Sequence, residues 1–101
     1  MNEDLVPGLK RNEHKTMLTL VPPEMIEELA KVFEYGLQKY ERDSWRNFTP
    51  EQAVSCLPDA ALRHFYAWMK GEIYDQESGL PHLLSAAWNI LVVDFHTRDK
   101  I

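Results

Sequence analysis

Between Arg63 and Asn89, polar and charged residues interrupt two segments whose apolar residues otherwise recur at helical spacing. An apolar helix that keeps histidine and asparagine on one stripe must either satisfy those groups internally or use them, because an unpaired buried polar group costs free energy. The stretch therefore encodes either an internal hydrogen-bond network or a binding site, and helices carry it.

The first long helix is expected to begin at Pro22-Pro23 and to run to about Glu41. Proline suits the opening turn of a helix, and the acidic residues that follow suit the positive end of the helix dipole. Gly36 is a weak point in this segment. The apolar positions recur at helical spacing: Ile26, Leu29, Ala30, Phe33, Leu37 and Tyr40.

The second helical region is expected in two pieces. Thr49-Pro50-Glu51-Gln52 matches a capping box and opens a short helix over residues 50 to 56. Pro58 restarts a long helix over residues 58 to 72, and Gly71 loosens its end. The apolar stripe of this helix consists of Leu62, Tyr66, Met69 and Ile73.

The third long helix follows a turn over residues 74 to 79. Ser78 or Asp75 is expected to cap it, Pro81 lies in its first turn, and it continues to about His96. Its apolar positions lie nearly all round: Leu80, Leu84, Ala87, Leu91 and Phe95 on one side, widened by Leu83, Ile90 and Val92. Such a helix is buried on more than one side. The sequence thus predicts an all-α bundle of three main helices plus one short helix, completed by homo-oligomerisation.

Length and charge limit the class of protein. With 101 residues the chain forms one domain, which we expect as a polar arm over residues 1 to 16 and a helical domain over residues 17 to 101. The formal charge of −5 argues against a nucleic-acid polymer as partner. No secretory signal is visible and the longest apolar-rich run, 11 residues, is too short to span a bilayer, so we expect a soluble, cytoplasmic protein without a membrane partner. Cys56, the single cysteine, is interpreted as a small core residue.

An acidic group follows the second helix. Glu72 and Asp75 follow His64 by 8 and 11 residues, offsets that fall on roughly one face of a continuous helix, and Glu77 lies nearby. Oxygen ligands of this kind suit Mg²⁺ or Mn²⁺, ions that bind phosphates. The alternative is a solvated acidic helix end in which Asp75 is a helix cap.

Three polar residues lie on one stripe of the third helix, namely His82, Ser85 and Asn89, at spacings of three and four. They form the wall of a ligand site that faces the carboxylates, a satisfied internal network, or a hydrated stripe at an interface.

Cations and aromatic rings stand close together at two places. Lys39-Tyr40 and Trp45-Arg46-Asn47 could stack a base and contact phosphate, or Trp45 could seal the edge of the core beside a solvated cation. Arg63 could grip phosphate or pair with Asp59. The basic residues Lys10, Arg11 and Lys15 are most simply a solvated arm.

The order of these residues resembles a known family. The string Arg-His…Gly-Glu-x-x-Asp-x-Glu-Ser-Gly-x-x-His over residues 63 to 82 is its most specific part, with the Lys-Tyr…Trp element before it and Asn89 after it. It is similar to a phage-associated branch, described as dATP/dGTP diphosphohydrolase, of the MazG-like all-α nucleoside triphosphate pyrophosphohydrolases. The resemblance covers residues 10 to 93.

The resemblance implies an enzyme that cleaves a (deoxy)nucleoside triphosphate, with purines favoured, to the monophosphate and pyrophosphate. It implies Mg²⁺ or Mn²⁺ as cofactor, a homodimer or homotetramer, and the host cytoplasm as location if the chain is phage-encoded. Glu72, Asp75 and Glu77 are the implied catalytic residues, and the implied metal ligands are these three and His64. The implied substrate-binding residues are Lys15, Lys39, Trp45, Asn47, Arg63, His82 and Asn89.

Two departures from the family pattern leave a second hypothesis open. The wider superfamily has an earlier Glu-x-x-Glu pair, for which Glu24-x-x-Glu27 fits the spacing and Glu34 is a looser candidate. Ser85 stands where a second histidine is expected. The alternative function is therefore a non-catalytic helical module that binds a nucleotide or a partner.

Overall fold

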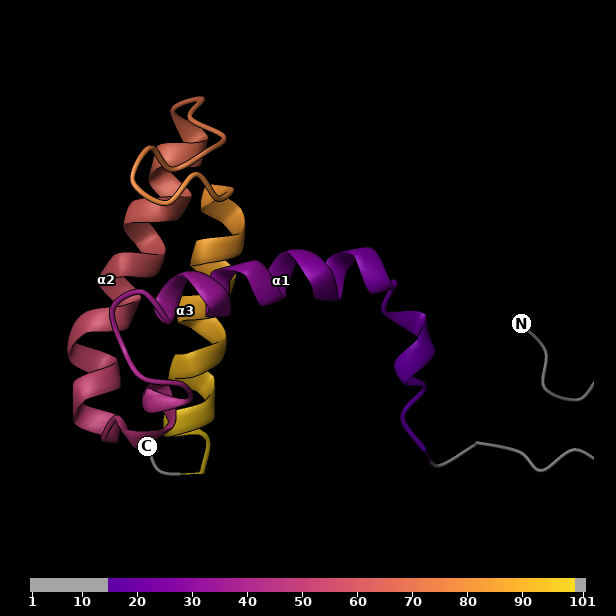
Figure 1. The fold of residues 1–101 in the computed structure, drawn as a ribbon. Helices are drawn as coiled ribbons and strands as arrows, with labels where there is room; N and C mark the ends of the chain where they lie inside the picture. The colour runs from indigo at the N-terminus through magenta and orange to yellow at the C-terminus, as the bar shows by residue number, and fades with distance from the viewer. Residues whose placement is uncertain (1–14, 100–101) are drawn as a thin grey trace, which may run out of the picture.

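The computed structural model describes residues 15 to 99 and folds them into three α-helices and two short 3-10 helices (Figure 1). The α-helices are α1 (Pro23–Gly36), α2 (Pro50–Met69) and α3 (His82–Thr97), and the 3-10 helices are η2 (Leu18–Leu20) and η3 (Ser44–Asn47). Over residues 15 to 99 there is no β-strand, only an isolated bridge between Tyr74 and Pro81. The predicted all-α class is confirmed. Of the predicted polar arm, all but residues 15 and 16 lie outside the described residues.

None of the helices over the described range combines the length and the apolar character that crossing a bilayer requires.

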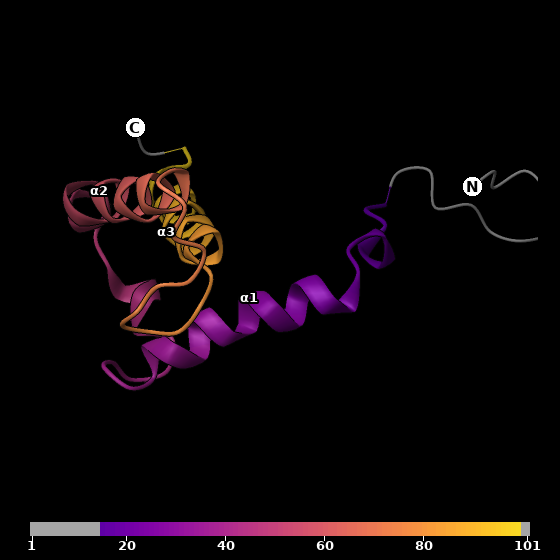
Figure 2. The same ribbon diagram turned by 90° about the horizontal axis from the view of Figure 1, so that it is seen from above.

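Helices α2 and α3 lie side by side and run in opposite directions (Figures 1 and 2). The buried apolar side chains of this pair are small: Ala53 and Ala61 from α2, Ala86 and Val92 from α3. Small side chains let two helix backbones approach closely, so the pair is held by close packing rather than by a bulky core.

Helix α1 crosses this pair at its carboxyl-terminal half. Phe33 packs edge-on against Trp88 of α3, with ring centroids 6.1 Å apart, and against Trp45 of η3, with ring centroids 5.9 Å apart. The first half of α1 and the segment with η2 extend away from α2 and α3 (Figures 1 and 2). The aromatic contacts therefore fix the carboxyl-terminal end of α1, while its first half leaves Met25 and Ile26 exposed.

The prediction of two helices across Pro58 is wrong, since α2 is continuous from Pro50 to Met69. The predicted capping box is confirmed: Thr49 Oγ1 accepts from Gln52 N at 3.1 Å, and Gln52 Oε1 accepts from Thr49 N at 2.9 Å. Proline in a helix interior removes one backbone hydrogen bond. Here the cap at the start and the packing against α3 along its length keep the helix intact.

The remaining helix boundaries differ from the predictions for local reasons. α1 ends at Gly36, not near Glu41, because the amides of residues 37 to 39 bond to carbonyls three residues back instead of four. α2 ends at Met69, where Gly71 has φ +100° and the amides of Gly71 and Glu72 bond to the carbonyls of Trp68 and Ala67. This is a Schellman motif, which satisfies carbonyls at the helix end. α3 begins at His82 without a side-chain cap, so the prediction that Ser78 or Asp75 caps it is wrong.

The helix faces are also oriented differently from the prediction. The predicted stripe of α2 (Leu62, Tyr66, Met69, with Ile73 beyond the helix) is exposed, and α3 exposes Leu83, Ile90, Leu91 and Phe95. What α3 buries is His82, Ser85, Ala86, Asn89, Val92 and His96. Cys56 is exposed, so its interpretation as a core residue is wrong. The interior of the helix pair is narrow and lined by small residues, and it accepts the polar stripe instead of the large apolar side chains.

Replacing Thr49 by alanine is expected to lower the free energy of unfolding by about 1 kcal/mol, because the cap that starts α2 is lost. Urea unfolding followed by circular dichroism measures this change. Thr49→Ser keeps the hydroxyl and is expected to retain most of the stability. Equal stability of Thr49→Ala and wild type would show that packing alone determines where α2 begins.

Candidate functional site

The loop between α2 and α3 holds Asp75 in a fixed position. Asp75 N donates to the carbonyl of Leu80 at 2.8 Å, and the Asp75 carbonyl accepts from Gly79 N at 2.7 Å. The Asp75 carboxylate accepts from Glu77 N at 3.1 Å and from the Ser78 hydroxyl at 3.2 Å. The Ser-Gly dipeptide thus has a local role, since Gly79 supplies the positive φ of +75° at this turn. Asp75 caps this turn and not α3.

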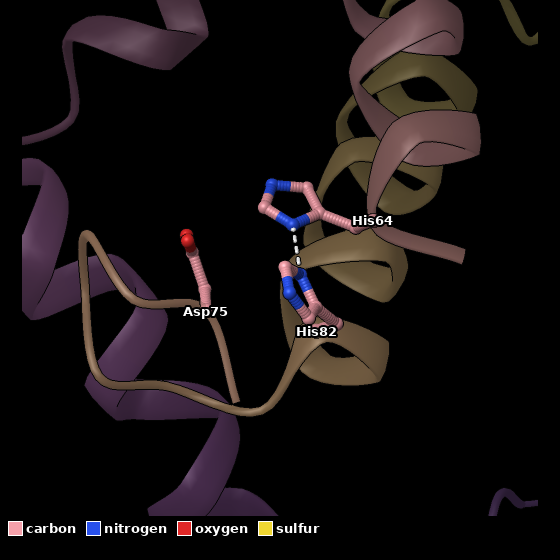
Figure 3. Close-up of side chains that lie close together, drawn as sticks. All are labelled: His64, Asp75 and His82. Atoms are coloured by element: carbon pink, nitrogen blue, oxygen red, sulfur yellow. Dashed lines mark hydrogen bonds between the residues drawn. The ribbon is translucent and has the colours of Figure 1, made fainter. Parts of the chain in front are cut away.

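Two histidines meet beside this loop, one from α2 and one from the first turn of α3 (Figure 3). His64 Nδ1 lies 2.8 Å from His82 Nδ1, and His82 Nε2 lies 3.0 Å from Glu72 Oε1. One ligand atom from each of His64, Asp75 and His82 can be chosen so that all three lie within 4.8 Å of one another. Among residues 15 to 99 this is the group whose spacing could hold a metal ion.

The hydrogen bonds of His82 fix where its proton lies. The Glu72 carboxylate accepts, so neutral His82 carries its proton on Nε2 and its Nδ1 is an acceptor. His64 then donates from Nδ1 to His82. Burial lowers the pKa of His64 below 6.5; the nearby Asp75 charge opposes this shift, and His82 adds to it. Neutral imidazoles are the form that binds metals and accepts protons.

The structure separates the residues of the predicted acidic group. Asp75 lies with the two histidines, and Glu72 contacts His82. Glu77 turns toward α1, where its Oε1 accepts from Lys39 Nζ at 3.1 Å and from the Tyr35 hydroxyl at 3.2 Å. That contact raises the pKa of Lys39 through the hydrogen bond and the charge of Glu77.

A cavity of about 520 Å³ opens next to this cluster, within the size range of small-molecule sites. His64, Asp75 and Ser78 line one part of it. The end of α1 and the following loop contribute Tyr35, Lys39, Tyr40 and Arg42, and the aromatic part consists of Phe33, Trp45, Phe48 and Trp88. Ser85 and Asn89 line it from α3. The cavity therefore joins metal-type ligands, cations and aromatic rings.

His96 is a residue that the sequence interpretation missed. It is buried, and its Nε2 lies 2.6 Å from the carbonyl oxygen of Trp45, to which Nε2–H donates. Its ring also lies against Phe48 and Phe95. His96 follows Asn89 by seven residues and so continues the stripe of His82, Ser85 and Asn89, a signal that was present in the sequence. It anchors η3 and with it the position of Trp45.

The other predicted substrate residues are distributed unevenly. Asn89 is buried, lines the cavity and donates to the carbonyl of Ser85 at 2.8 Å. Trp45 also lines the cavity and carries Arg46 over its ring, 5.3 Å from the centroid. Arg63 and Asn47 are exposed, outside the cavity lining, and over the described range Arg63 makes no ion pair with Asp59. Lys15 is exposed in the segment before η2, which extends away from α2 and α3, and it is outside the cavity lining.

The candidates for the earlier acidic pair of the superfamily also lie in different places. Glu34 lines the cavity beside the histidine pair. Glu24 and Glu28 line a separate hollow between α1, the α2–α3 loop and the start of α3. The acid of α1 that lines the cavity is therefore Glu34, and neither Glu24 nor Glu27 is part of the lining.

Comparisons with known proteins agree with the family resemblance. Residues 6–101 match a family model described as dATP/dGTP diphosphohydrolase, N-terminal. Over 86 residues the chain is 35% identical to a protein of Salmonella phage PMBT28 named dATP/dGTP diphosphohydrolase. That match covers 85% of this chain but only 28% of the relative's length. No solved structure matches the chain.

The pKa of His64 is expected below 6.5 in the folded protein, because burial disfavours its charged form. A titration of the histidine ring signals by NMR, without added metal, measures it. Asp75→Asn should lower this pKa further, because the carboxylate that favours the charged ring is removed. A His64 that titrates at 6.5 or above would contradict the packing of the two rings described above.

Proposed function

Because this chain belongs to the family described as dATP/dGTP diphosphohydrolase, N-terminal, we propose that it carries the reaction site of a hydrolase of deoxynucleoside triphosphates. The reaction is water attack on the triphosphate with cleavage between the α and β phosphates. It releases the nucleoside monophosphate and pyrophosphate. Purine substrates, dATP and dGTP, are the first candidates, from the name of the phage relative.

The composition of the cavity beside the histidine pair is the observation that supports this function best. A nucleoside triphosphate has an aromatic base at one end and up to four negative charges at the other. The lining of the cavity supplies both kinds of group: aromatic rings that pack through Phe33, namely Trp45 and Trp88, and the polar side chains of His64, Asp75 and Lys39. A purely structural helical module has no need for a cavity that combines these groups.

The phosphate part of the site is built from a cation and from groups that hold a divalent ion. Lys39 is charged and half exposed, so it can leave Glu77 and contact a phosphate oxygen. A divalent ion, proposed here as Mg²⁺ or Mn²⁺, would neutralise phosphate charge and lower the pKa of a bound water. Asp75 and Glu72 are the carboxylates nearest the histidine pair, and they are the candidates for aligning the attacking water.

The base part of the site is held by α3. His96 fixes the carbonyl of Trp45, and Phe33 packs edge-on against the same indole ring. Stacking on an aromatic side chain contributes about 1–3 kcal/mol per base. Trp88 Nε1 is buried and has no hydrogen-bond partner within residues 15 to 99, so a donor is available beside this part of the cavity.

A non-catalytic nucleotide-binding module is the second candidate. Two observations favour it: the cavity beside the histidine pair receives one acid of α1, Glu34, instead of an acidic pair, and Ser85 occupies the place of an expected histidine. In that case a nucleotide binds and no pyrophosphate is released.

The function also implies an assembly, and we propose a homodimer or homotetramer. Over residues 15 to 99, twenty large apolar side chains are exposed while five apolar residues are buried. A second copy that covers part of this surface would supply the core that one chain lacks.

Pyrophosphate release from the eight common NTPs and dNTPs, with Mg²⁺, Mn²⁺ or EDTA, tests the activity. We expect metal-dependent release that is strongest with a purine deoxynucleotide. Glu72→Gln and Asp75→Asn should lower turnover by roughly 10²- to 10⁴-fold with unchanged helicity. Asp94→Asn, which alters a carboxylate paired with Arg98 outside the cavity lining, is the control. Nucleotide binding without release, in a folded protein, would select the non-catalytic module.

The assembly is tested by light scattering after size-exclusion chromatography. We expect a mass of two or four chains. Ile90→Glu adds a charge to the exposed face of α3 and should lower that mass, whereas Ser55→Glu at an exposed polar position should not. A monomer at tens of micromolar would contradict the proposed assembly.

A further inference from the structure

We infer that His64, His82 and Asp75 form a binding site for a transition-metal ion of the Mn²⁺, Co²⁺ or Zn²⁺ type, and that Glu72 positions His82 for it. The inference rests on the proposed function and deepens it, because that function leaves the ion as Mg²⁺ or Mn²⁺ and the ligands decide against Mg²⁺. The ligand set differs from the acidic group of Glu72, Asp75, Glu77 and His64 that the sequence predicts. The site lies where α2, the α2–α3 loop and α3 meet (Figure 3).

The distances allow one ion to reach all three side chains. Two nitrogen ligands about 2.0–2.1 Å from a tetrahedral ion lie about 3.4 Å apart. The two Nδ1 atoms are 2.8 Å apart, and the ligand atoms of all three residues lie within 4.8 Å of one another. Binding thus requires side-chain adjustments on the order of half an ångström to one ångström, with no change in the helices.

Glu72 supplies the support that a histidine ligand needs. It accepts the Nε2–H of His82 at 3.0 Å, which leaves the lone pair of His82 Nδ1 directed at the site. Metal-binding histidines in proteins commonly donate their other ring N–H to a carboxylate in this way. Glu72 is about half exposed whereas His82 is buried, so the carboxylate acts from the outer side of the imidazole.

The proton between the two rings must leave when an ion binds. In the ion-free pair His64 donates from Nδ1 to His82 Nδ1. Neutral His64 can carry the same proton on Nε2 and ligate through Nδ1, so the total number of protons is unchanged. His64 is half-buried and lines the open cavity, which gives solvent access for this exchange.

The chemistry of the donors favours a transition metal over Mg²⁺. Mg²⁺ requires oxygen ligands, while imidazole nitrogens suit Zn²⁺, Co²⁺ and Mn²⁺. The site offers two imidazoles and one carboxylate, since Glu77 is held by Lys39 and Tyr35. Three protein ligands leave at least one coordination position open, as in catalytic metal sites. His64 and Asp75 line the cavity, so that position faces the space proposed for the triphosphate.

Metal affinity is measured by calorimetric titration of the whole chain with Mn²⁺, Zn²⁺ and Mg²⁺ in the absence of nucleotide. We expect one strong site for Mn²⁺ or Zn²⁺ and an affinity for Mg²⁺ at least about 100-fold weaker. Nitrogen-15 NMR of the zinc form should show His82 with its proton retained on Nε2. This readout reports the ligand atom and does not depend on activity.

Three variants and one matched control separate the two ligand sets. His64→Ala and His82→Ala should each weaken Mn²⁺ or Zn²⁺ binding by more than about 100-fold, and Glu72→Gln by roughly 10- to 100-fold. Glu77→Gln removes a neighbouring carboxylate and should change the affinity by less than about threefold. Circular dichroism identifies any variant that fails to fold. If His82→Ala is such a variant, His64→Ala and Glu72→Gln decide the question, because both residues are partly exposed.

Several outcomes would overturn the inference. These are binding that survives both histidine variants, Mg²⁺ binding as tight as Zn²⁺ binding, or a Glu77→Gln loss as large as that of His82→Ala. The last would restore the acidic site. Metal binding through the histidines without any hydrolysis would uphold the inference and remove the proposed function. Hydrolysis that persists in His64→Ala and His82→Ala would uphold the proposed function and remove the inference.

Discussion

The buried stripe of α3 is largely polar, and its hydrogen bonds position the groups that contact it. His82, Asn89 and His96 are buried, and a buried polar group is stable only when it is hydrogen-bonded. Each one therefore fixes a partner: His82 holds His64 and Glu72, Asn89 closes onto the carbonyl of Ser85, and His96 holds the carbonyl of Trp45. Removal of His96 would take away the donor to the carbonyl of Trp45, and with it the contact that holds η3 against α3.

The same stripe explains why the large apolar side chains face outward. Small residues such as Ala53, Ala61 and Ala86 bring α2 and α3 close together, which leaves no room between them for the leucines and aromatics of either helix. Those side chains remain on the outer faces, at Leu62 and Met69 of α2 and at Ile90 of α3. Their exposure is the direct consequence of a polar interior, and it supports the proposed assembly of several copies.

Local features were predictable from the sequence, and long-range pairings were not. The capping box at Thr49, the role of Gly71 at the end of α2 and the common stripe of His82, Ser85 and Asn89 all follow from spacings within a few residues. Glu77 pairs with Lys39 and Tyr35 across about forty residues, and the approach of α1 that makes this possible leaves no local signal. Pro58 is the converse case: locally it predicts a helix break, but α2 continues through it because the helix packs against α3.

The two sides of the cavity are held in different ways, which bears on how a substrate enters. The histidine pair rests on α2 and α3, which pack along their length. On the α1 side, Lys39 is held by Glu77 through an exposed ion pair, and such pairs stabilise a structure by no more than about 1 kcal/mol. An anionic ligand can therefore compete with Glu77 for Lys39 at small cost, while the geometry of the histidines stays unchanged. A site of this kind keeps its metal ligands rigid and lets its phosphate-binding cation adjust.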